Sequence, residues 1–529
     1  MQAADPTVQL HTGPFIWNVC VIDNIDLREA TYKYGNVYDV AGKSFHATLR
    51  MIFQFKLPVE ISSISDKKIT LSVGHKIFGD DDEYIQEWLQ KINVVFKALV
   101  TKNSFDMDEI NKELVDHIDL GCRIEEPNVV ILEAGDSPSN NKSIFNTCQA
   151  YFRDLDIEKG RLDIWADQAI HQRLIKFNDK NSTQSELRVG LGQWHTSNVM
   201  CTALTLMFSS YGIYNCAYEL GVRYLEKFEY NSDYRATCRV LEMIWTSTGI
   251  ALHNYLMQKG LTLEQLMKGD DNLVKVWALY FKWASFWKGH KVGIQRGNAD
   301  MQFCNLAAFA PLFPCTGRVN YFKSVAHFLA EYQRYPQLRK LLQHACSVNI
   351  TQEGHYLAFD EALEFFGVKF VKQNLKNRII DEKDLKQQIK AVQSERARTD
   401  LLFSIFNDNH IPSESAHTIN ERSAAVEQLA KKMLEAFNSQ SPDEHSLFRG
   451  CTQLTPTGYK NIFDSYSDGV ERLQDFYDQE IINKEEPDSA GRARRSVVIT
   501  HSKDILRVLT SKAQQEVESQ SNAPVVIIE

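Results

Sequence analysis

Two short apolar runs, each closed by an aspartate, constrain the fold of this chain most strongly. The first run, residues 17–22, ends at Asp23, and the second, residues 162–166, ends at Asp167. Short runs rich in apolar, β-branched and aromatic residues predict buried strands. Much later in the chain, Glu364 lies in a stretch with the residue spacing of a helix. We therefore expect two strands that end in carboxylates and one helix that carries a third.

Strand-like segments dominate the first part of the chain, and helix-like segments dominate the middle. Runs at 45–55, 129–132 and 187–191 also predict strands, whereas residues 84–100 have helical periodicity. From 198 to about 342, nearly the whole sequence has the apolar spacing of amphipathic helices. This order predicts an α/β fold in which a mixed sheet is followed by a large all-helical block.

Composition narrows the class of protein. Of the 529 residues, 43% are hydrophobic and 24% charged, as in globular proteins. The ten cysteines form no CxxC pair and no zinc-finger spacing, which favours reduced thiols. We see neither a secretory signal nor an apolar run of membrane-spanning length, so we expect an intracellular protein, nuclear or cytoplasmic, without membrane contact. The net charge of −9 argues against coating nucleic acid through bulk electrostatics, but allows a local basic groove.

Three carboxylates placed in this way suit a pair of divalent cations. Mg²⁺ and Mn²⁺ prefer carboxylate oxygens, and two such ions can support in-line cleavage of a phosphodiester. In this interpretation Asp23 bridges both ions, Asp167 holds one, and Glu364 holds the other. Asp360 and Glu361 compete for the third role because both share a helical face with Glu364. Taken singly, an aspartate after a strand is more often a turn or cap residue.

Four sequence blocks around these acids occur in order along the chain. They are Val21-Ile22-Asp23-Asn24-Ile25-Asp26, Ala166-Asp167-Gln168-Ala169-Ile170, Leu191-Gly192-Gln193-Trp194-His195, and Asp360-Glu361-Ala362-Leu363-Glu364 with Lys369 and Lys372 behind it. Together they resemble transposases of the RNase H-like (DDE-type) class, especially fungal and invertebrate transposon proteins related to Mutator-like elements. The resemblance covers roughly residues 15–380.

The resemblance implies an RNase H-like mixed sheet core, with the first aspartate on the first strand and the second on the fourth. It divides the chain into the first part of the core at 13–197, a helical insertion domain at 198–354, a core-completing acidic helix with C-terminal helices at 355–480, and a flexible tail at 481–529. It further implies two Mg²⁺ or Mn²⁺ ions at Asp23, Asp167 and Glu364. The implied partners are DNA, as transposon ends and target, and further copies of the chain in a homo-oligomer.

The function implied by the resemblance is metal-dependent DNA strand cleavage and strand transfer, either retained or lost in a relic. One alternative is a catalytically silent DNA- or chromatin-binding protein on the same scaffold. Another is a purely helical interaction protein in which the strands are misassigned. Enzymes of this class usually carry a DNA-binding module before the core, whereas this chain starts almost at its first strand. We therefore expect a truncated or decayed copy, or one end of a longer product.

Two positions depart from the family pattern. Gly192 stands three residues before His195, where Mutator-like enzymes usually carry Cys or Asp. Gly367 stands three residues after Glu364, where related sequences commonly place Asn. These departures bear on activity and leave the predicted fold intact. Gly190-x-Gly192 lacks the third glycine of a dinucleotide-binding loop and stands on the wrong side of a strand, so we reject that motif.

Several other positions have both a structural and a functional interpretation. We expect His195 to be a structural histidine at a strand exit. The aromatic and basic segment 283–291 has the spacing of a core stripe, although it also resembles a surface that binds DNA ends or single strands. The basic cluster 492–495 is either solvated charge, a nuclear localisation signal or a DNA contact. Phosphate contacts are hypothesised for Arg296, Arg318 and Tyr321.

Overall fold

Five strands form one mixed sheet with the order β3-β2-β1-β4-β5. The strands are β1 (Ile16–Arg28), β2 (Ser44–Lys56), β3 (Asn128–Ile131), β4 (Gly160–Ala166) and β5 (Ser185–Leu191). β2 pairs antiparallel with both β1 and β3, whereas β1, β4 and β5 run parallel to one another. All five predicted strands are present, so the mixed α/β class is confirmed and a purely helical protein is excluded.

The structure is a computed structural model, and it describes residues 5–28, 44–102, 107–115, 118–158, 160–181, 185–349, 356–374, 383–391, 416–441, 445–451 and 453–483. The chain separates into two compact units, Met1–Ile482 and Asn483–Glu529. The basic cluster 492–495 lies outside the described residues, as does nearly all of the expected tail.

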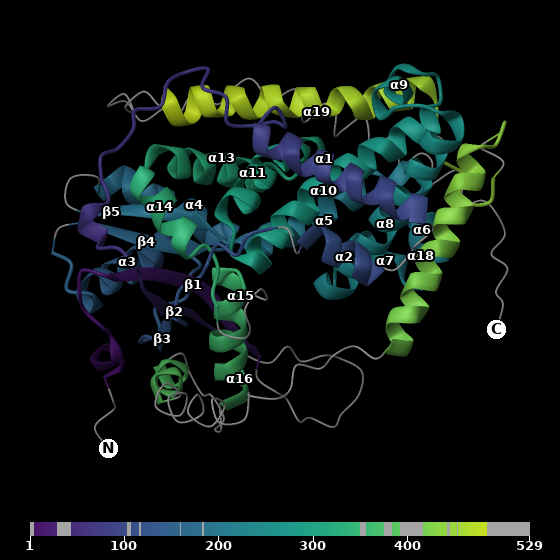
Figure 1. Ribbon diagram of the computed structural model, residues 1–529. Helices are drawn as coiled ribbons and strands as arrows, with labels where there is room; N and C mark the ends of the chain where they lie inside the picture. Colours follow the sequence, from purple (N-terminus) through teal and green to yellow (C-terminus); the bar gives the residue numbers. More distant parts are fainter. Residues whose placement is uncertain are drawn as a thin grey trace, which may run out of the picture. The chain divides into compact units, whose positions relative to one another are not determined.

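Both faces of the sheet are apolar, because alternate residues of a strand point to opposite sides. Val19 and Val21 of β1 belong to the larger of two buried clusters, and Cys20 and Ile22 belong to the smaller one. The smaller cluster lies under two helices, α3 (Asn141–Asp154) and α4 (Gln168–Asn181). The larger cluster continues into the helices on the other face. The sheet is therefore the middle of three layers (Figure 1).

The middle of the chain is helical, as its periodicity predicts. Its helices are α5 (Gln193–Met207), α6 (Ile213–Glu219), α7 (Leu225–Glu229), α8 (Tyr234–Lys259), α9 (Leu263–Lys268), α10 (Asn272–Arg296), α11 (Ala299–Phe309), α12 (Leu312–Cys315), α13 (Val319–Arg334) and α14 (Pro336–His344). Short 3₁₀ turns cover Pro6–Gln9, Ile61–Ser63 and Ser209–Tyr211. In Figure 1 the strands lie on the left, and α6 and α8 lie on the right.

Helices from distant parts of the sequence pack against this helical block. They are α1 (Glu83–Lys102), α2 (Met107–Val115), α18 (Ala416–Phe437) and α19 (Pro456–Phe476), which continues as a π-helical turn at Tyr477–Ile482. α1 packs against α8, α10 and α11, and α18 packs against α8. Phe96 of α1 meets the rings of Trp245 and Phe281 edge-on, with both centroid distances 5.1 Å. Segments before and after the middle block therefore complete its core.

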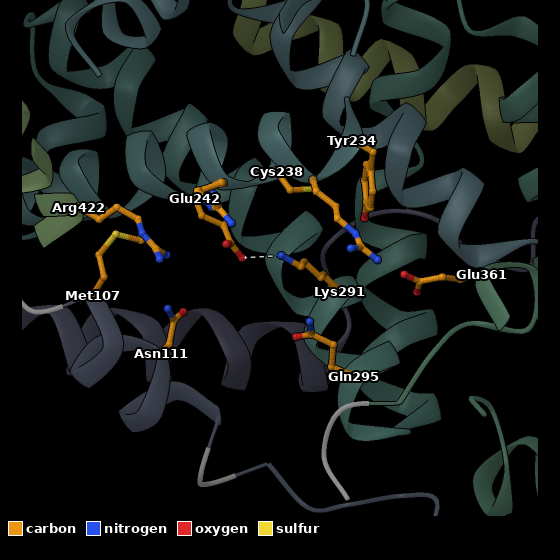
Figure 2. Close-up of a pocket in the computed structure, with 11 residues that line it drawn as sticks. Met107, Asn111, Tyr234, Cys238, Glu242, Lys291, Gln295, Glu361 and Arg422 are labelled. Carbon is orange, nitrogen blue, oxygen red and sulfur yellow. Dashed lines mark hydrogen bonds and ion pairs between the residues drawn. The ribbon is translucent and has the colours of Figure 1, made fainter. Parts of the chain in front are cut away.

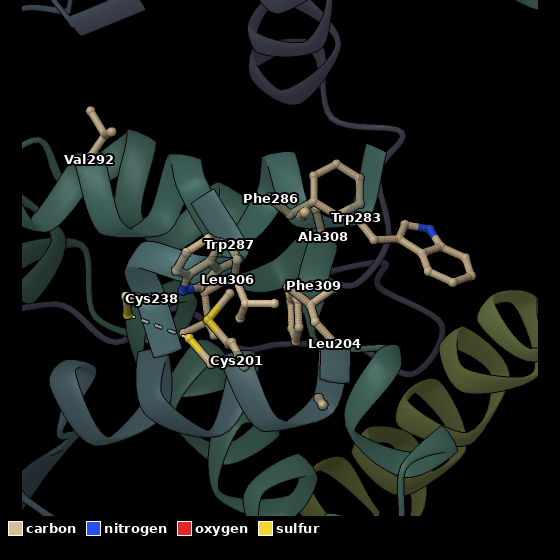
Figure 3. Packing of buried hydrophobic residues seen from close by; sticks show 14 of the residues in the cluster. Cys201, Leu204, Cys238, Trp283, Phe286, Trp287, Val292, Leu306, Ala308 and Phe309 are labelled. Atoms are coloured by element: carbon tan, nitrogen blue, oxygen red, sulfur yellow. Dashed lines mark hydrogen bonds between the residues drawn. The ribbon is translucent and has the colours of Figure 1, made fainter. Parts of the chain in front are cut away.

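The aromatic segment of α10 lies in the core and not on a surface. Trp283, Phe286 and Trp287 are each no more than 1% exposed. Figure 3 shows Trp287 packed near Cys201 and Cys238, whereas Trp283 points the other way. The hypothesis that these aromatic rings form a DNA-binding surface is therefore wrong, and the core stripe is confirmed.

The predicted acidic helix is a continuous helical segment with one irregular turn. It comprises α15 (Phe359–Leu363), the π-helical turn η4 (Glu364–Lys369) and α16 (Phe370–Asn374). Phe359 anchors the segment on the sheet, with its ring 4.9 Å from Trp165 of β4 and 6.1 Å from Phe55 of β2. Residues 383–391 are also helical. Among the described helices, none combines the length and apolar character needed to cross a bilayer.

Candidate functional site

Asp23 and Asp167 occupy matching positions on two neighbouring parallel strands. The pairing of β1 with β4 ends at Ile22 and Ala166, so each aspartate is the residue that follows the last paired position. Because the strands are parallel, both carboxylates emerge at the same edge of the sheet. Asp167 also caps α4, since its Oδ1 accepts a hydrogen bond from the Ile170 N–H at 2.8 Å. The structure thus brings the first two predicted site residues together.

Glu364 belongs to the same electrostatic neighbourhood. Burial, together with the charges of Asp167 and Glu364, raises the pKa of Asp23 to about 7, against the opposing effect of His195. Glu364 begins the π-helical turn η4, and such turns are frequent at functional sites. Asp167 and Glu364 therefore both act on the charge of Asp23, although the three acids come from separate elements.

Asp360 has a different role, because its carboxylate is bound by protein groups. It is 3% exposed and accepts hydrogen bonds from the backbone N–H groups of Trp194 at 3.1 Å and His195 at 2.9 Å. The His195 Nδ1 lies 2.9 Å from the same carboxylate. Asp360 therefore caps the start of α5 and is excluded as the third acid of the Asp23 site.

His195 and Asp360 form a buried ion pair beside the two strand-end aspartates. Burial alone lowers the pKa of His195, but the hydrogen bond to Asp360 and the charges of Asp360, Asp23 and Asp167 raise it to about 9. Burial likewise opposes ionisation of Asp360, yet hydrogen bonds and charge from His195 hold its pKa below the ordinary value. This contact agrees with the structural role predicted for His195. The positive charge of His195 also acts on the carboxylate of Asp23.

The two unusual glycines are explained by close packing around these groups. A Cβ atom at Gly192 would lie 2.6 Å from the Asp360 Oδ2, so Asp360 occupies the space of a residue-192 side chain. A Cβ atom at Gly367 would lie 2.7 Å from the Met51 Cε and 2.8 Å from Leu49 Cδ2, because η4 lies directly on β2. Neither Cys or Asp at 192 nor Asn at 367 would fit without displacing these neighbours.

Glu361 lines a cavity of about 350 Å³ together with residues of α8 and α10 (Figure 2). Burial, together with the charge of Asp360, raises the pKa of Glu361 to about 7, and Arg235 and Lys291 oppose this rise. Glu361 therefore lines that cavity, whereas Glu364 contributes to the electrostatic environment of Asp23.

Of the three residues for which we hypothesised phosphate contacts, two lie near the acids. Burial raises the pKa of Tyr321 well above its usual range, and Asp167 and Asp360 contribute to this rise while Arg318 opposes it. The Nε of Arg318 is buried and has no hydrogen-bond partner within the described part of the chain. Arg296 instead donates a hydrogen bond from its Nη2 to the Ile118 carbonyl at 2.9 Å, and this contact holds the loop that contains Ile118.

The donor chemistry fits hard divalent cations. Asp23, Asp167 and Glu364 offer carboxylate oxygens, and the buried Asn24 Oδ1 has no partner among the described residues. The Nε2 of Gln168 is also without one. As the described side chains are placed, no three His, Cys, Asp or Glu residues stand close enough together to hold an ion. The residues are thus of the right type, but binding of an ion requires the carboxylates to move closer.

Sequence reasoning missed Asn24, Gln168 and the capping role of Asp360. Asn24 and Gln168 directly follow the two aspartates, which is the signal that was available in the sequence. No such signal joined Asp360 to His195, which are far apart along the chain. Only the packing of α15 against α5 places them in contact.

No protein-family model, curated protein or solved structure gave a significant match to this chain. Its function is therefore inferred from the geometry and chemistry of its own residues.

Proposed function

We propose that this chain has an RNase H-like core derived from a DDE-type transposase, and that it cleaves and joins DNA strands with Mg²⁺ or Mn²⁺. The observation that carries the proposal is the placement of Asp23 and Asp167 at the same edge of the sheet, on β1 and directly after β4. That is where such a core places its first two acids. Glu364 completes the set from a helical segment that packs on the same sheet.

The residues have separable tasks in this mechanism. Asp23, Asp167 and Glu364 would hold two ions which, when bound, activate an attacking water or 3′-hydroxyl and stabilise the leaving oxygen. The ion pair of His195 with Asp360 holds the start of α5 beside these acids. Arg318, whose buried Nε has no hydrogen-bond partner among the described residues, would contact a phosphate oxygen.

Metal binding is the first test, because it needs no knowledge of the DNA sequence. We expect Mn²⁺ to bind the full chain and raise its melting temperature, and we expect this effect to be lost in Asp23→Asn, Asp167→Asn and Glu364→Gln. Glu361→Gln should still bind Mn²⁺, because that carboxylate faces the other cavity. Asp119→Asn and Glu264→Gln are matched controls, since both side chains are largely exposed, 95% and 79%.

Nicking of supercoiled plasmid with Mn²⁺ then separates the two candidate functions. Wild type should nick the plasmid, and Asp23→Asn should lower the rate by at least about 100-fold, because one of the carboxylates that would hold the ions is lost. The alternative function is that of a catalytically silent DNA-binding protein on the same scaffold. Its signature is DNA binding without nicking and without a Mn²⁺ effect on melting.

A further inference from the structure

Two buried cysteines from different helices lie side by side in the helical block. Cys201 of α5 and Cys238 of α8 are 37 positions apart along the chain, and their Sγ atoms are 3.7 Å apart. Figure 3 shows the two sulfur atoms facing each other near Trp287. Both are free thiols, and the sulfur atoms of a disulfide are about 2.05 Å apart. A small shift of the two side chains would therefore bring the sulfur atoms to bonding distance.

One of the two thiols also borders a cavity. Cys238 is 3% exposed and lines the space of about 350 Å³ that Glu361 lines, whereas Cys201 is fully buried. Figure 2 shows Cys238 among the side chains around this cavity. A small oxidant such as a peroxide can reach a thiol in a cavity wall more readily than one enclosed by the core. Cys238 is therefore the thiol that meets the oxidant first.

The surroundings of Cys238 favour its thiolate, which is the reactive form of cysteine. Lys288 and Lys291 of α10 both donate hydrogen bonds to the Glu242 Oε1, at 2.8 and 3.0 Å. Burial raises the pKa of Cys238, but the hydrogen bond with Cys201 and the charge of Lys291 help to hold it below its usual value. Burial and the neighbouring thiol raise the pKa of Cys201. Cys201 therefore stays protonated and donates the hydrogen bond to Cys238.

We propose that Cys201 and Cys238 form a dithiol that a peroxide oxidises to a reversible disulfide. The Cys238 thiolate attacks one peroxide oxygen, the O–O bond breaks, and a sulfenic acid forms. The second oxygen leaves as hydroxide and becomes water with the proton that Cys238 had released. The Cys201 sulfur then attacks the Cys238 sulfur, the S–O bond breaks, and the hydroxyl group leaves as water with the proton of Cys201. One peroxide is thus reduced to two waters while the two thiols lose two electrons.

The disulfide would tie α5 to α8 and close a loop of the chain between them. The two cysteines are 37 positions apart, and such a cross-link stabilises a fold mainly by restricting the unfolded chain. Disulfides in reducing compartments are usually transient, because thiol reductants reverse them. The dithiol would therefore switch the helical block between a reduced form and a more stable oxidised form. Neither the acids nor DNA takes part, so this reaction is independent of the proposed function.

Peptide mapping of the oxidised full chain tests the dithiol directly. The native protein is treated with hydrogen peroxide, its remaining thiols are alkylated in urea, and its peptides are analysed by mass spectrometry. We expect a peptide cross-linked through Cys201 and Cys238 that dithiothreitol removes, and a melting temperature about 2–4 °C higher in the oxidised form. Cys20 and Cys148, which are also fully buried, should stay reduced. A cross-link that forms only after unfolding in urea would overturn the proposal.

Single variants separate the tasks of the two thiols, once circular dichroism shows that each variant is folded. In Cys201→Ser the sulfenic acid at Cys238 should persist and be trapped by dimedone, whereas in Cys238→Ser dimedone should not label Cys201. Lys291→Gln should slow oxidation about three- to tenfold, because less of the Cys238 thiol is ionised. Lys268→Gln, at a side chain that is 75% exposed, should leave the rate unchanged. Labelling of Cys201 in Cys238→Ser, or equal rates in Lys291→Gln and wild type, would overturn the assignment of Cys238 as the attacking thiol.

Discussion

At the scale of single residues, the buried carboxylate of Asp23 costs stability when it is ionised. Its folded-state pKa of about 7 lies above the ordinary value of 3.8, because burial and two neighbouring carboxylates penalise its charge. A group with a raised acid pKa binds more protons in the folded state than in the unfolded state. The free energy of unfolding therefore falls as pH rises from about 4 to about 7, and the penalty is complete above that range.

Asp23→Asn should remove this penalty in the metal-free protein. We expect the variant to be more stable than wild type at pH 8, on the order of 2–4 kcal/mol, and close to wild type at pH 4. Urea unfolding in EDTA at the two pH values measures the difference. Asp119→Asn, at an exposed position, should show no such pH dependence. Equal stability of Asp23→Asn and wild type at pH 8 would contradict the raised pKa.

At the scale of elements, the junction between α15 and the start of α5 depends on one carboxylate. The first N–H groups of a helix have no hydrogen-bond partner within the helix. At the start of α5, the Asp360 carboxylate accepts hydrogen bonds from two of these N–H groups. The same carboxylate keeps His195 protonated, with a pKa of about 9. This pair stabilises the fold fully below about pH 6.5, and its contribution is lost as pH rises through about 9.

Asp360→Asn should destabilise the junction by about 2–4 kcal/mol at pH 6, because it leaves a buried imidazolium without its partner. The loss should shrink toward pH 9.5, where His195 is neutral in both proteins. NMR titration should show the pKa of His195 falling in the variant. Gly192→Ala adds a Cβ atom that would clash with the same carboxylate, so this variant should also be less stable than wild type. An unchanged His195 titration in Asp360→Asn would disprove the pairing.

At the scale of the whole molecule, the sheet and the helical block share one core. The larger buried cluster runs from Val19 of β1 to Trp245 of α8 and Leu473 of α19 without interruption. Phe359 contacts the sheet from the segment that carries Glu364. Sheet and helices should therefore unfold together, since neither keeps a complete core without the other.

Phe359→Ala should lower the free energy of unfolding by about 3–5 kcal/mol, because it leaves a cavity between the sheet and the acidic helical segment. Far-UV circular dichroism and tryptophan fluorescence should report the same shifted midpoint. Phe365→Ala, at a side chain that is 44% exposed, should change stability by no more than about 0.5 kcal/mol. Separate midpoints for the two probes would show that the two parts unfold independently.

Periodicity alone allowed most elements to be predicted, because burying one face imposes a repeat on the sequence. All five strands and the helix with Ile85, Trp88 and Ile92 on its buried face lie where the pattern placed them. The first two candidate acids were found for a similar reason, since each ends an apolar run. The π-helical turn at Glu364 left no such repeat, and neither did the packing of α1 and α18 on α8.

The local order of strands, helices and strand-end acids was readable from the chain, because it reflects interactions between residues a few positions apart. The distribution of roles among the acids was not readable, because it depends on contacts between residues far apart in sequence. Asp360, Glu361 and Glu364 have the same chemistry and nearly the same position along the chain. Packing places Asp360 at the start of α5, Glu361 in the wall of the cavity that it shares with α8 and α10, and Glu364 within electrostatic range of Asp23, so that tertiary structure alone separates a cap, a pocket wall and a candidate ligand.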